Sequence, residues 1–313
     1  MRRFFLGVLL LLAAALPFIF QGYWLYVAIV GLYYAVLASS WAMLAGQVGI
    51  ISFAHAAFAA VGAYTSAMLV IYLNFPIPLA MVAGSGAAAV FGLAIGALTL
   101  KMRGPYLALT TLAFSEIFRI FLTAEYELTR GSYGLKVPLM LDGNKTWCYY
   151  IGLLLLVATV TTLSLVLRSK LGLFLLAMRE DEDGAATRGV NTVYYRLCAF
   201  VITSACAGLA GGFYAHVIGL VSPRISTISE MGLILAMSVF GGLESLMGSA
   251  LGALALQSLT EYLRAFEEWR LAIFGGLVLL ILKFTPQGLL PRLSELLDTC
   301  RQRKSNMLKD EHR

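Results

Sequence analysis

The stretch from Trp147 to Leu167 reads WCYYIGLLLLVATVTTLSLVL and contains no charged residue. A helix needs about 20 mainly apolar residues to cross the bilayer core, which is about 30 Å thick. The run from Leu153 to Val160 is apolar except for Thr159, whereas the strands of a membrane barrel alternate apolar and polar residues. This stretch therefore predicts a transmembrane helix.

The composition of the whole chain agrees with that local pattern. Of its 313 residues, 60% are hydrophobic and only 13% are charged, and the mean hydropathy is +0.83. Soluble domains average roughly 45–50% apolar and about 25% charged residues. A single soluble core of this size could not bury so much apolar surface, so we expect an all-α polytopic membrane protein.

Other apolar segments follow the same pattern along the chain. The stretch Met231–Leu263 is too long for one span and is interrupted by the sequence Gly-Gly-Leu-Glu-Ser at 241–245, which predicts a break between two shorter helices. With these two, we expect about ten transmembrane or half-spanning helices; the others are Phe4–Phe20, Trp24–Ala45, Ile51–Leu73, Ile77–Leu100, Pro105–Ala124, Trp147–Leu167, Leu197–Leu220 and Leu271–Leu290.

The distribution of basic residues predicts the orientation. Short cytoplasmic loops collect Lys and Arg, and with ten spans both termini lie on one side. If that side is the cytoplasm, most loop Lys and Arg residues are inside, and the outer loops keep only Arg130, Lys136, Lys145, Arg224, Arg264 and Arg270. The net charge of +6 is thus explained by topology, and we expect no nucleic-acid partner. A cleaved signal peptide at the N-terminus is the alternative for the first segment.

Several kinds of chemistry have no sequence support. The four cysteines form no CxxC pair, and the three histidines have no ligand spacing with them, so we expect no metal site and no cofactor. The chain contains no Gly-Lys-Ser or Gly-Lys-Thr, hence no phosphate-binding P-loop. The protein is not expected to be an enzyme, and any ATP hydrolysis would occur on a separate subunit.

Polar residues and glycines gather at a few places inside the apolar segments. Such groups are costly in hydrocarbon unless they face protein or a water-filled path, and helix breaks near the midplane form the binding sites of many transporters. We therefore predict a translocation pathway lined by Gln47, Ser52, His55, Thr110, Thr111, Ser115, Glu116, Gly241 and Gly242. Simple packing is the alternative for His55, a structural ion pair with Arg119 for Glu116, and an interfacial loop position for Glu244.

The clearest segment outside the membrane runs from Arg168 to Arg196. Its central part, Arg179–Asn191, begins with acidic residues, continues through a short Ala-containing helical run and ends at Gly189. Acidic residues in a first turn favour helix formation, but so short a helix is marginal alone. We expect it to dock on a soluble partner, with a solvated loop as the alternative.

Taken together, these segments resemble a known family, the permease subunits of ABC importers for branched-chain amino acids of the leucine, isoleucine and valine type. The similar pieces occur in a consistent order between about residues 40 and 260: Gly46–Tyr64, Arg103–Tyr106 with Thr110–Ala113, Leu128–Leu135, Arg179–Asn191, Ala207–Gly212 and Gly241–Gly248. The chain departs from the family at Arg130, where a glycine is usual, and at Ile50 and Ile51, where Ser and Leu are common.

The resemblance implies a division of labour. A second homologous permease would complete the pore in the lipid bilayer, two cytoplasmic ABC ATPases would drive it, and an extracytoplasmic binding protein would deliver the solute across a bacterial inner membrane. Residues 1–291 would form the permease domain, with a coupling loop at about 168–196, and 292–313 a basic cytoplasmic tail. The residues expected to couple to the ATPase are Arg179, Glu180, Asp181, Glu182, Asp183, Gly184, Ala185, Arg188 and Gly189.

Transport by alternating access is the function that follows. Permeases for urea or short amides look similar, so the solute stays open between these and branched-chain amino acids. An ion-coupled secondary transporter is a further alternative, although it should carry more acidic residues or histidines along its spans.

Overall fold

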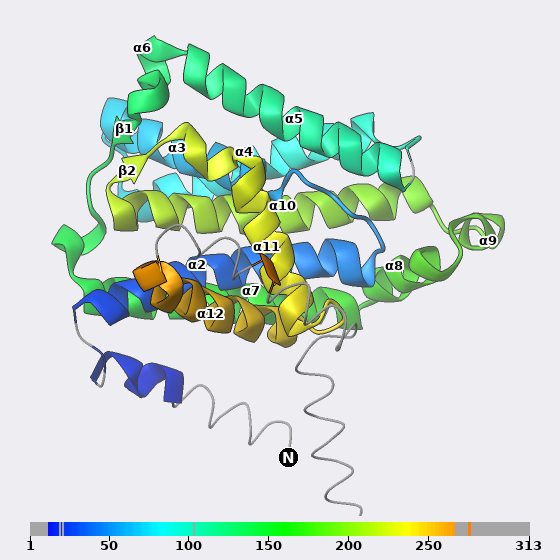
Figure 1. Ribbon diagram of the computed structural model, residues 1–313. Helices are drawn as coiled ribbons and strands as arrows, with labels where there is room; N and C mark the ends of the chain where they lie inside the picture. Colours follow the sequence, from blue (N-terminus) through cyan, green and yellow to red (C-terminus); the bar gives the residue numbers. More distant parts are fainter. Residues whose placement is uncertain (1–11, 19, 21, 103, 267–274, 277–313) are drawn as a thin grey trace, which may run out of the picture.

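The computed structural model describes residues 12–18, 20, 22–102, 104–266 and 275–276. Its long helices lie side by side and run in roughly parallel or antiparallel directions (Figure 1). The longer helices are α2 (Tyr23–Ala42), α3 (His55–Leu73), α4 (Ile77–Leu98), α5 (Pro105–Ala124), α7 (Lys145–Arg168), α8 (Lys170–Glu180), α10 (Thr192–Ile218), α11 (Ile228–Gly241) and α12 (Leu246–Tyr262).

Short elements connect these helices. They are η1 (Met43–Gln47), α6 (Tyr126–Thr129), η2 (Gly131–Tyr133), β1 (Leu135–Lys136), η3 (Met140–Gly143), α9 (Glu182–Thr187), β2 (Leu220–Val221), η4 (Pro223–Ser226) and η5 (Leu263–Phe266). The two strands pair antiparallel, Leu135 with Val221 and Lys136 with Leu220. Since β1 precedes α7 and β2 follows α10, this pair ties together two loops at the same end of the bundle.

The described helices confirm the all-α membrane fold. Six are long and apolar enough to span a bilayer, and the pair α11 and α12 is a bent seventh candidate with 118° between its halves; the six are Tyr23–Gln47, His55–Leu73, Ile77–Leu98, Pro105–Ala124, Lys145–Arg168 and Thr192–Ile218. Each corresponds to one predicted segment. The predicted span at Phe4–Phe20 is described only at residues 12–18 and 20, and most of Leu271–Leu290, like the tail 292–313, lies outside the described residues.

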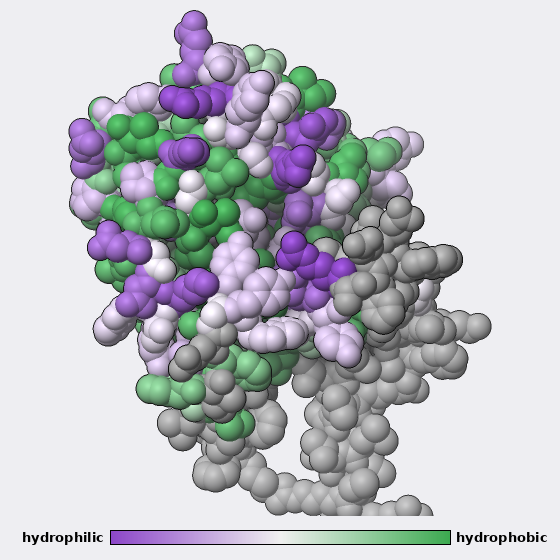
Figure 2. Space-filling model, turned by 60° about the vertical axis from the view of Figure 1, so that its left-hand side comes forward, coloured by the Kyte–Doolittle hydropathy of each residue, from purple (hydrophilic) through white to green (hydrophobic). Residues whose placement is uncertain are grey.

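The bundle has two distinct ends. At one end, Lys145 at the start of α7 contacts Gly22 just before α2, with Nζ 3.4 Å from the carbonyl oxygen, and the Tyr23 hydroxyl contacts Glu261 near the end of α12. At the opposite end lie α8 and α9, and α9 projects beyond the bundle (Figure 1). We call the second end the coupling end. Figure 2 brings the first end towards the viewer and shows hydrophilic side chains scattered among apolar ones.

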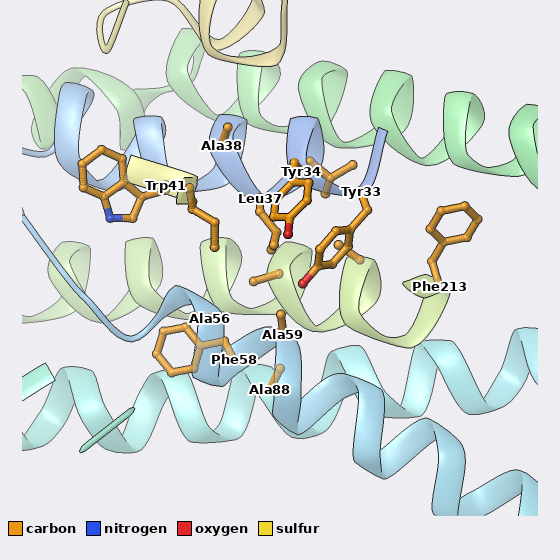
Figure 3. Packing of buried hydrophobic residues seen from close by; sticks show 14 of the residues in the cluster. Tyr33, Tyr34, Leu37, Ala38, Trp41, Ala56, Phe58, Ala59, Ala88 and Phe213 are labelled. Carbon is orange, nitrogen blue, oxygen red and sulfur yellow. The ribbon is translucent and has the colours of Figure 1, made fainter. Parts of the chain in front are cut away.

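The core is built around α2, α3, α4 and α10. Figure 3 shows Tyr33, Leu37 and Trp41 of α2 in the same packed layer as Phe58 of α3 and Phe213 of α10. Helices α3, α4 and α10 approach each other especially closely, because glycines face neighbouring backbone there. Lipid gives no hydrophobic drive for helix association, so close packing through small residues holds such helices together.

Candidate translocation and coupling site

The glycine-rich break predicted at 241–245 and a second break, the chain from Gly46 to Ala54 between α2 and α3, lie against each other at the coupling end. The α2 helix ends in the π-helical turn η1, and Gln47 in that turn donates a hydrogen bond from Nε2 to the backbone oxygen of Glu244, over 2.8 Å. Gly46 packs so closely that a Cβ atom there would fall 2.0 Å from the carbonyl oxygen of Leu243. Gln47, Gly241 and Gly242, which are far apart in sequence, thus belong to one junction.

The short helix predicted between Arg179 and Asn191 is α9. Asp181 caps it, because its Oδ1 accepts a hydrogen bond from the backbone N–H of Gly184 over 3.0 Å. Gly189 follows with a φ of 86°, a conformation that favours glycine. Asn191 then caps α10 by accepting a hydrogen bond from the N–H of Tyr194, over 3.0 Å.

The segment also contains a second helix, α8, which the sequence reasoning did not separate from the loop. Its residues Gly172, Leu175 and Met178 are buried at helical spacing, whereas Leu173 and Leu176 are exposed. Arg179 lies in the last turn of α8 rather than in the docking helix. The predicted coupling residues are therefore shared between the end of α8, the helix α9 and the turn after it.

Two ion pairs attach this segment to the bundle. Arg179 Nη2 lies 3.1 Å from Glu244 Oε1, in the loop between α11 and α12, and the Glu244 side chain is 74% exposed. The second pair is more buried, since Arg196 at the base of α10 is 7% exposed and its Nη2 lies 3.0 Å from Glu182 Oε1 in α9. Arg196 also donates from Nη1 to the carbonyl oxygen of Leu100 over 2.9 Å.

The coupling segment presents a mostly charged outer surface. Between Arg179 and Gly189 its exposed members are Arg179, Glu180, Asp181, Asp183, Ala186, Thr187, Arg188 and Gly189, whereas Glu182 and Gly184 are half-buried and Ala185 is buried. Ala185 therefore supports the fold of the segment, and the neighbouring Ala186 is the small residue that can meet a partner.

A second group of predicted residues lies deeper in the bundle. Ser52, His55 and Thr111 are all fully buried. The chain between η1 and α3 is not helical, and side chains satisfy part of its backbone: Thr111 Oγ1 accepts from the N–H of Phe53 over 2.9 Å, and Trp41 Nε1 donates to the carbonyl oxygen of Ser52 over 2.7 Å. Helix α3 consequently starts at His55, later than the predicted Ile51.

His55 is an unusual member of this group. Its imidazole is completely buried, yet neither ring nitrogen has a hydrogen-bond partner among the described residues. The ring packs against Phe58, with centroids 5.9 Å apart at 65°. Buried polar atoms are normally satisfied by protein or water, so this ring has unused hydrogen-bonding capacity inside the bundle.

The remaining predicted residues lie along α5. Ser115 is buried, and its Oγ lies 3.4 Å from the Oγ of Ser226 in η4. Glu116 forms the expected ion pair with Arg119, whose Nε is 3.1 and 3.0 Å from the two carboxylate oxygens. Thr110 does not join the buried group, because it is only half-buried; its hydroxyl donates to the carbonyl oxygen of Tyr106 in its own helix, over 2.8 Å.

Three polar contacts were missed by the sequence reasoning. Tyr34 donates to Glu230 Oε2 over 2.6 Å, and Arg196, counted only as a cytoplasmic charge, is the buried anchor described above. His216 lies between Ser66 and Pro138, with Nε2 2.9 Å from Ser66 Oγ and Nδ1 3.0 Å from the Pro138 oxygen. Partners so distant in sequence leave no local pattern that could reveal them.

A cavity of about 1000 Å³ lies on the other side of the junction, between α2, α7 and α12. Its walls are mainly apolar, with Leu153, Leu156 and Leu254 among them, while Gln47 and Glu244 border it. The deeper pathway group of Ser52, His55 and Thr111 does not line it. The cavity therefore borders the junction but not the pathway group.

Comparison with known proteins identifies the family. The model of the branched-chain amino acid transport system / permease component family matches residues 23–282. The chain belongs to this family. The match covers the six long spans, both helix breaks and the coupling segment, and it agrees with a multi-pass membrane permease rather than an enzyme.

Relatives with curated names agree. The chain is 32% identical to the high-affinity branched-chain amino acid transport system permease protein LivM of Escherichia coli (strain K12), over 93% of this chain and 75% of that protein. It is 27% identical to BraD of Pseudomonas aeruginosa, over 84% and 93%, and 25% identical to LivH of Escherichia coli (strain K12), over 83% and 91%. No solved structure gives a significant match to the chain.

Proposed function

We propose that this permease is the transmembrane subunit of an ATP-driven importer that moves branched-chain amino acids into a bacterial cell across its inner membrane. It would act with a second homologous permease, two cytoplasmic ABC ATPases and an extracytoplasmic solute-binding protein. The names of the relatives favour branched-chain amino acids over urea and short amides. In this proposal both termini of the chain are cytoplasmic.

The observation that carries the proposal is the contact between the coupling segment and the helix breaks. Arg179 connects α8 to Glu244 in the α11–α12 loop, and the backbone of Glu244 contacts Gln47 at the end of α2. A displacement of α9 by an ATPase would reach both breaks through this contact. ATP binding shifts the permease between outward-open and inward-open states only if the ATPase binds the two states with different affinity.

The pathway would begin at the junction and continue past Ser52, His55, Thr111 and Ser115. A zwitterionic solute needs polar groups for its charged ends, and unwound backbone and helix N-termini supply them in other transporters. The non-helical chain before α3 and the unsatisfied imidazole of His55 offer such groups next to apolar walls. Glu116 directly follows Ser115 in α5. Thr110, near the start of the same helix, would lie at the border of the pathway.

Reconstituted transport tests the proposal. The tagged chain is purified with the proteins that accompany it, placed in proteoliposomes and supplied with radiolabelled leucine. We expect uptake that requires ATP and continues without an ion gradient. Uptake driven by an ion gradient alone would refute the proposal and support a secondary transporter.

A matched pair of variants tests the role of α9. Ala186→Trp places a bulky ring on the exposed side of α9 and should abolish ATP-driven uptake while the chain still inserts. Thr146→Trp places the same bulky residue at an exposed position of α7, at the opposite end of the bundle. This variant should leave uptake unchanged. Equal uptake by both variants would refute the assignment of α9 as the ATPase contact.

A further inference from the structure

Helix α5 packs loosely against the rest of the described chain. Of the residues in its most apolar 18-residue stretch, only 22% are buried, against 89% in the span Tyr23–Gln47. It lies along one side of the bundle (Figure 1). Its exposed side carries the large side chains of Tyr106, Leu109, Ile117, Ile120 and Phe121. Lipid could cover an apolar surface of this kind, so exposure alone does not define what lies against it.

Helix α7 provides the comparison that decides the question. In α7, too, 22% of the residues in the most apolar stretch are buried. This helix, however, has no charged residue between Trp147 and Leu167. Helix α5 instead carries Glu116 and Arg119 in its interior, with side chains 31% and 32% exposed. Of these two helices, α5 therefore presents charges at a depth where hydrocarbon would surround them, and α7 does not.

The ion pair between Glu116 and Arg119 does not use all the hydrogen-bond donors of the arginine. Glu116 lies eight residues before the end of α5 at Ala124, which places it about 12 Å inside the helix. The Arg119 Nε and Nη2 atoms donate to Glu116, but the guanidinium has further N–H groups that find no acceptor among the described residues. Lipid tails supply no acceptor either, and charged residues within spans normally face protein or water.

The charged side of α5 also borders the proposed pathway. Ser115, the neighbour of Glu116, contacts Ser226 in η4 and lines a small hollow with Phe53 and Met231. Arg119 lies one turn along α5 from Ser115, so a chain that covers the ion pair would lie next to this hollow.

We propose that the face of α5 that carries Glu116 and Arg119 is the docking surface for the second permease chain. A soluble ATPase or binding protein cannot reach groups at this depth, whereas a second chain of the same fold brings its own polar side chains to the same level of the membrane. Both LivM and LivH of Escherichia coli (strain K12) match most of this chain, which indicates that two such permeases occur in one cell. The inference rests on the proposed function, because it needs the second permease.

Site-specific photo-crosslinking in the complete transporter tests the surface. A benzophenone amino acid replaces Ile120 on α5, one turn along from Glu116 and 54% exposed, or Leu154 on α7, which is 67% exposed. After illumination of membranes, we expect the probe at 120 to give an adduct that mass spectrometry identifies as a permease chain. The probe at 154 should give none. Equal adducts from both positions, or an adduct from 154 alone, would overturn the proposal.

A second variant tests the polar pair itself. The double substitution Glu116→Leu with Arg119→Leu removes the charges and keeps an apolar helix. We expect less of the second permease to co-purify with this variant than with the parent chain, while Ile117→Ala retains it. Unchanged co-purification would show that the pair does not hold the partner. If no second permease accompanies even the parent chain, both this inference and the proposed function fail.

Discussion

The trio of helices α3, α4 and α10 and the coupling segment are held in opposite ways. In the trio, backbone meets backbone: a Cβ atom on Gly62 would fall 2.1 Å from the carbonyl oxygen of Gly208, and one on Gly211 would fall 1.9 Å from that of Ala59. The coupling segment is instead attached through the long side chains of Arg179 and Arg196. Close backbone packing permits one arrangement, whereas side-chain ion pairs can exchange partners.

This difference suggests which parts of the permease move. Packed interiors resist small displacements and shift between discrete arrangements. The trio therefore suits a fixed scaffold, and in the proposed importer the junction of Gln47, Arg179 and Glu244 would be a joint between that scaffold and an ATPase. The buried pair of Arg196 and Glu182 lies between these extremes, since it fixes α9 to the base of α10.

The largest expected effect comes from breaking the scaffold. Gly62→Ala forces a methyl group into the backbone of α10, and overpacking of this kind costs about 1–3 kcal/mol or more. Gly86→Ala in α4 is the matched control, because nothing lies within 4 Å of its new Cβ atom. Thermal unfolding in detergent should show a strongly destabilised Gly62 variant and a Gly86 variant as stable as the parent. Equal stability of the two would contradict the close approach of α3 and α10.

The next largest effect distinguishes the buried ion pair of Arg196 from the exposed ion pair of Arg179. Arg196→Gln removes the more buried member of its pair with Glu182, and loss of one member of a buried pair costs about 3 kcal/mol. Arg179→Gln removes a pair whose acid is mainly exposed, which is worth at most about 1 kcal/mol. Hydrogen exchange across residues 182–187 should rise in the first variant and stay at the parent level in the second. Similar exchange in both variants would mean that Arg196 does not anchor α9.

Much of the scaffold could be predicted because membrane spans leave a local signal. The continuous apolar run of α7 and the glycine-rich interruption at 241–245 each define an element without reference to any other part of the chain. The ends of elements were less predictable. Helix α3 starts at His55 because Thr111 and Trp41, which are distant in sequence, hold the preceding residues out of a helix.

The candidate site was predictable only as separate pieces. The sequence marked the residues around Gln47, Arg179 and Glu244 as unusual for three unrelated local reasons: glycines, an acidic cytoplasmic run and a helix break. Their contact depends on how α2, α8, α11 and α12 fold together, and no spacing in the chain encodes it. The same reason explains why Tyr34 and Glu230, which form a hydrogen bond across the bundle, were not predicted as a pair.

The smallest effect on stability, and the most direct test of the joint, comes from reversing its charges. Arg179→Glu and Glu244→Arg each place like charges where the pair now lies, and both sites are exposed enough that the fold should lose at most about 1 kcal/mol. ATP-driven uptake should nevertheless fall in each single variant, because α8 no longer holds the α11–α12 loop. The double variant restores opposite charges in the reverse order and should recover uptake. If the double variant transports no better than either single one, the contact of Arg179 with Glu244 does not transmit motion, and the coupling segment must act through the Arg196 anchor alone.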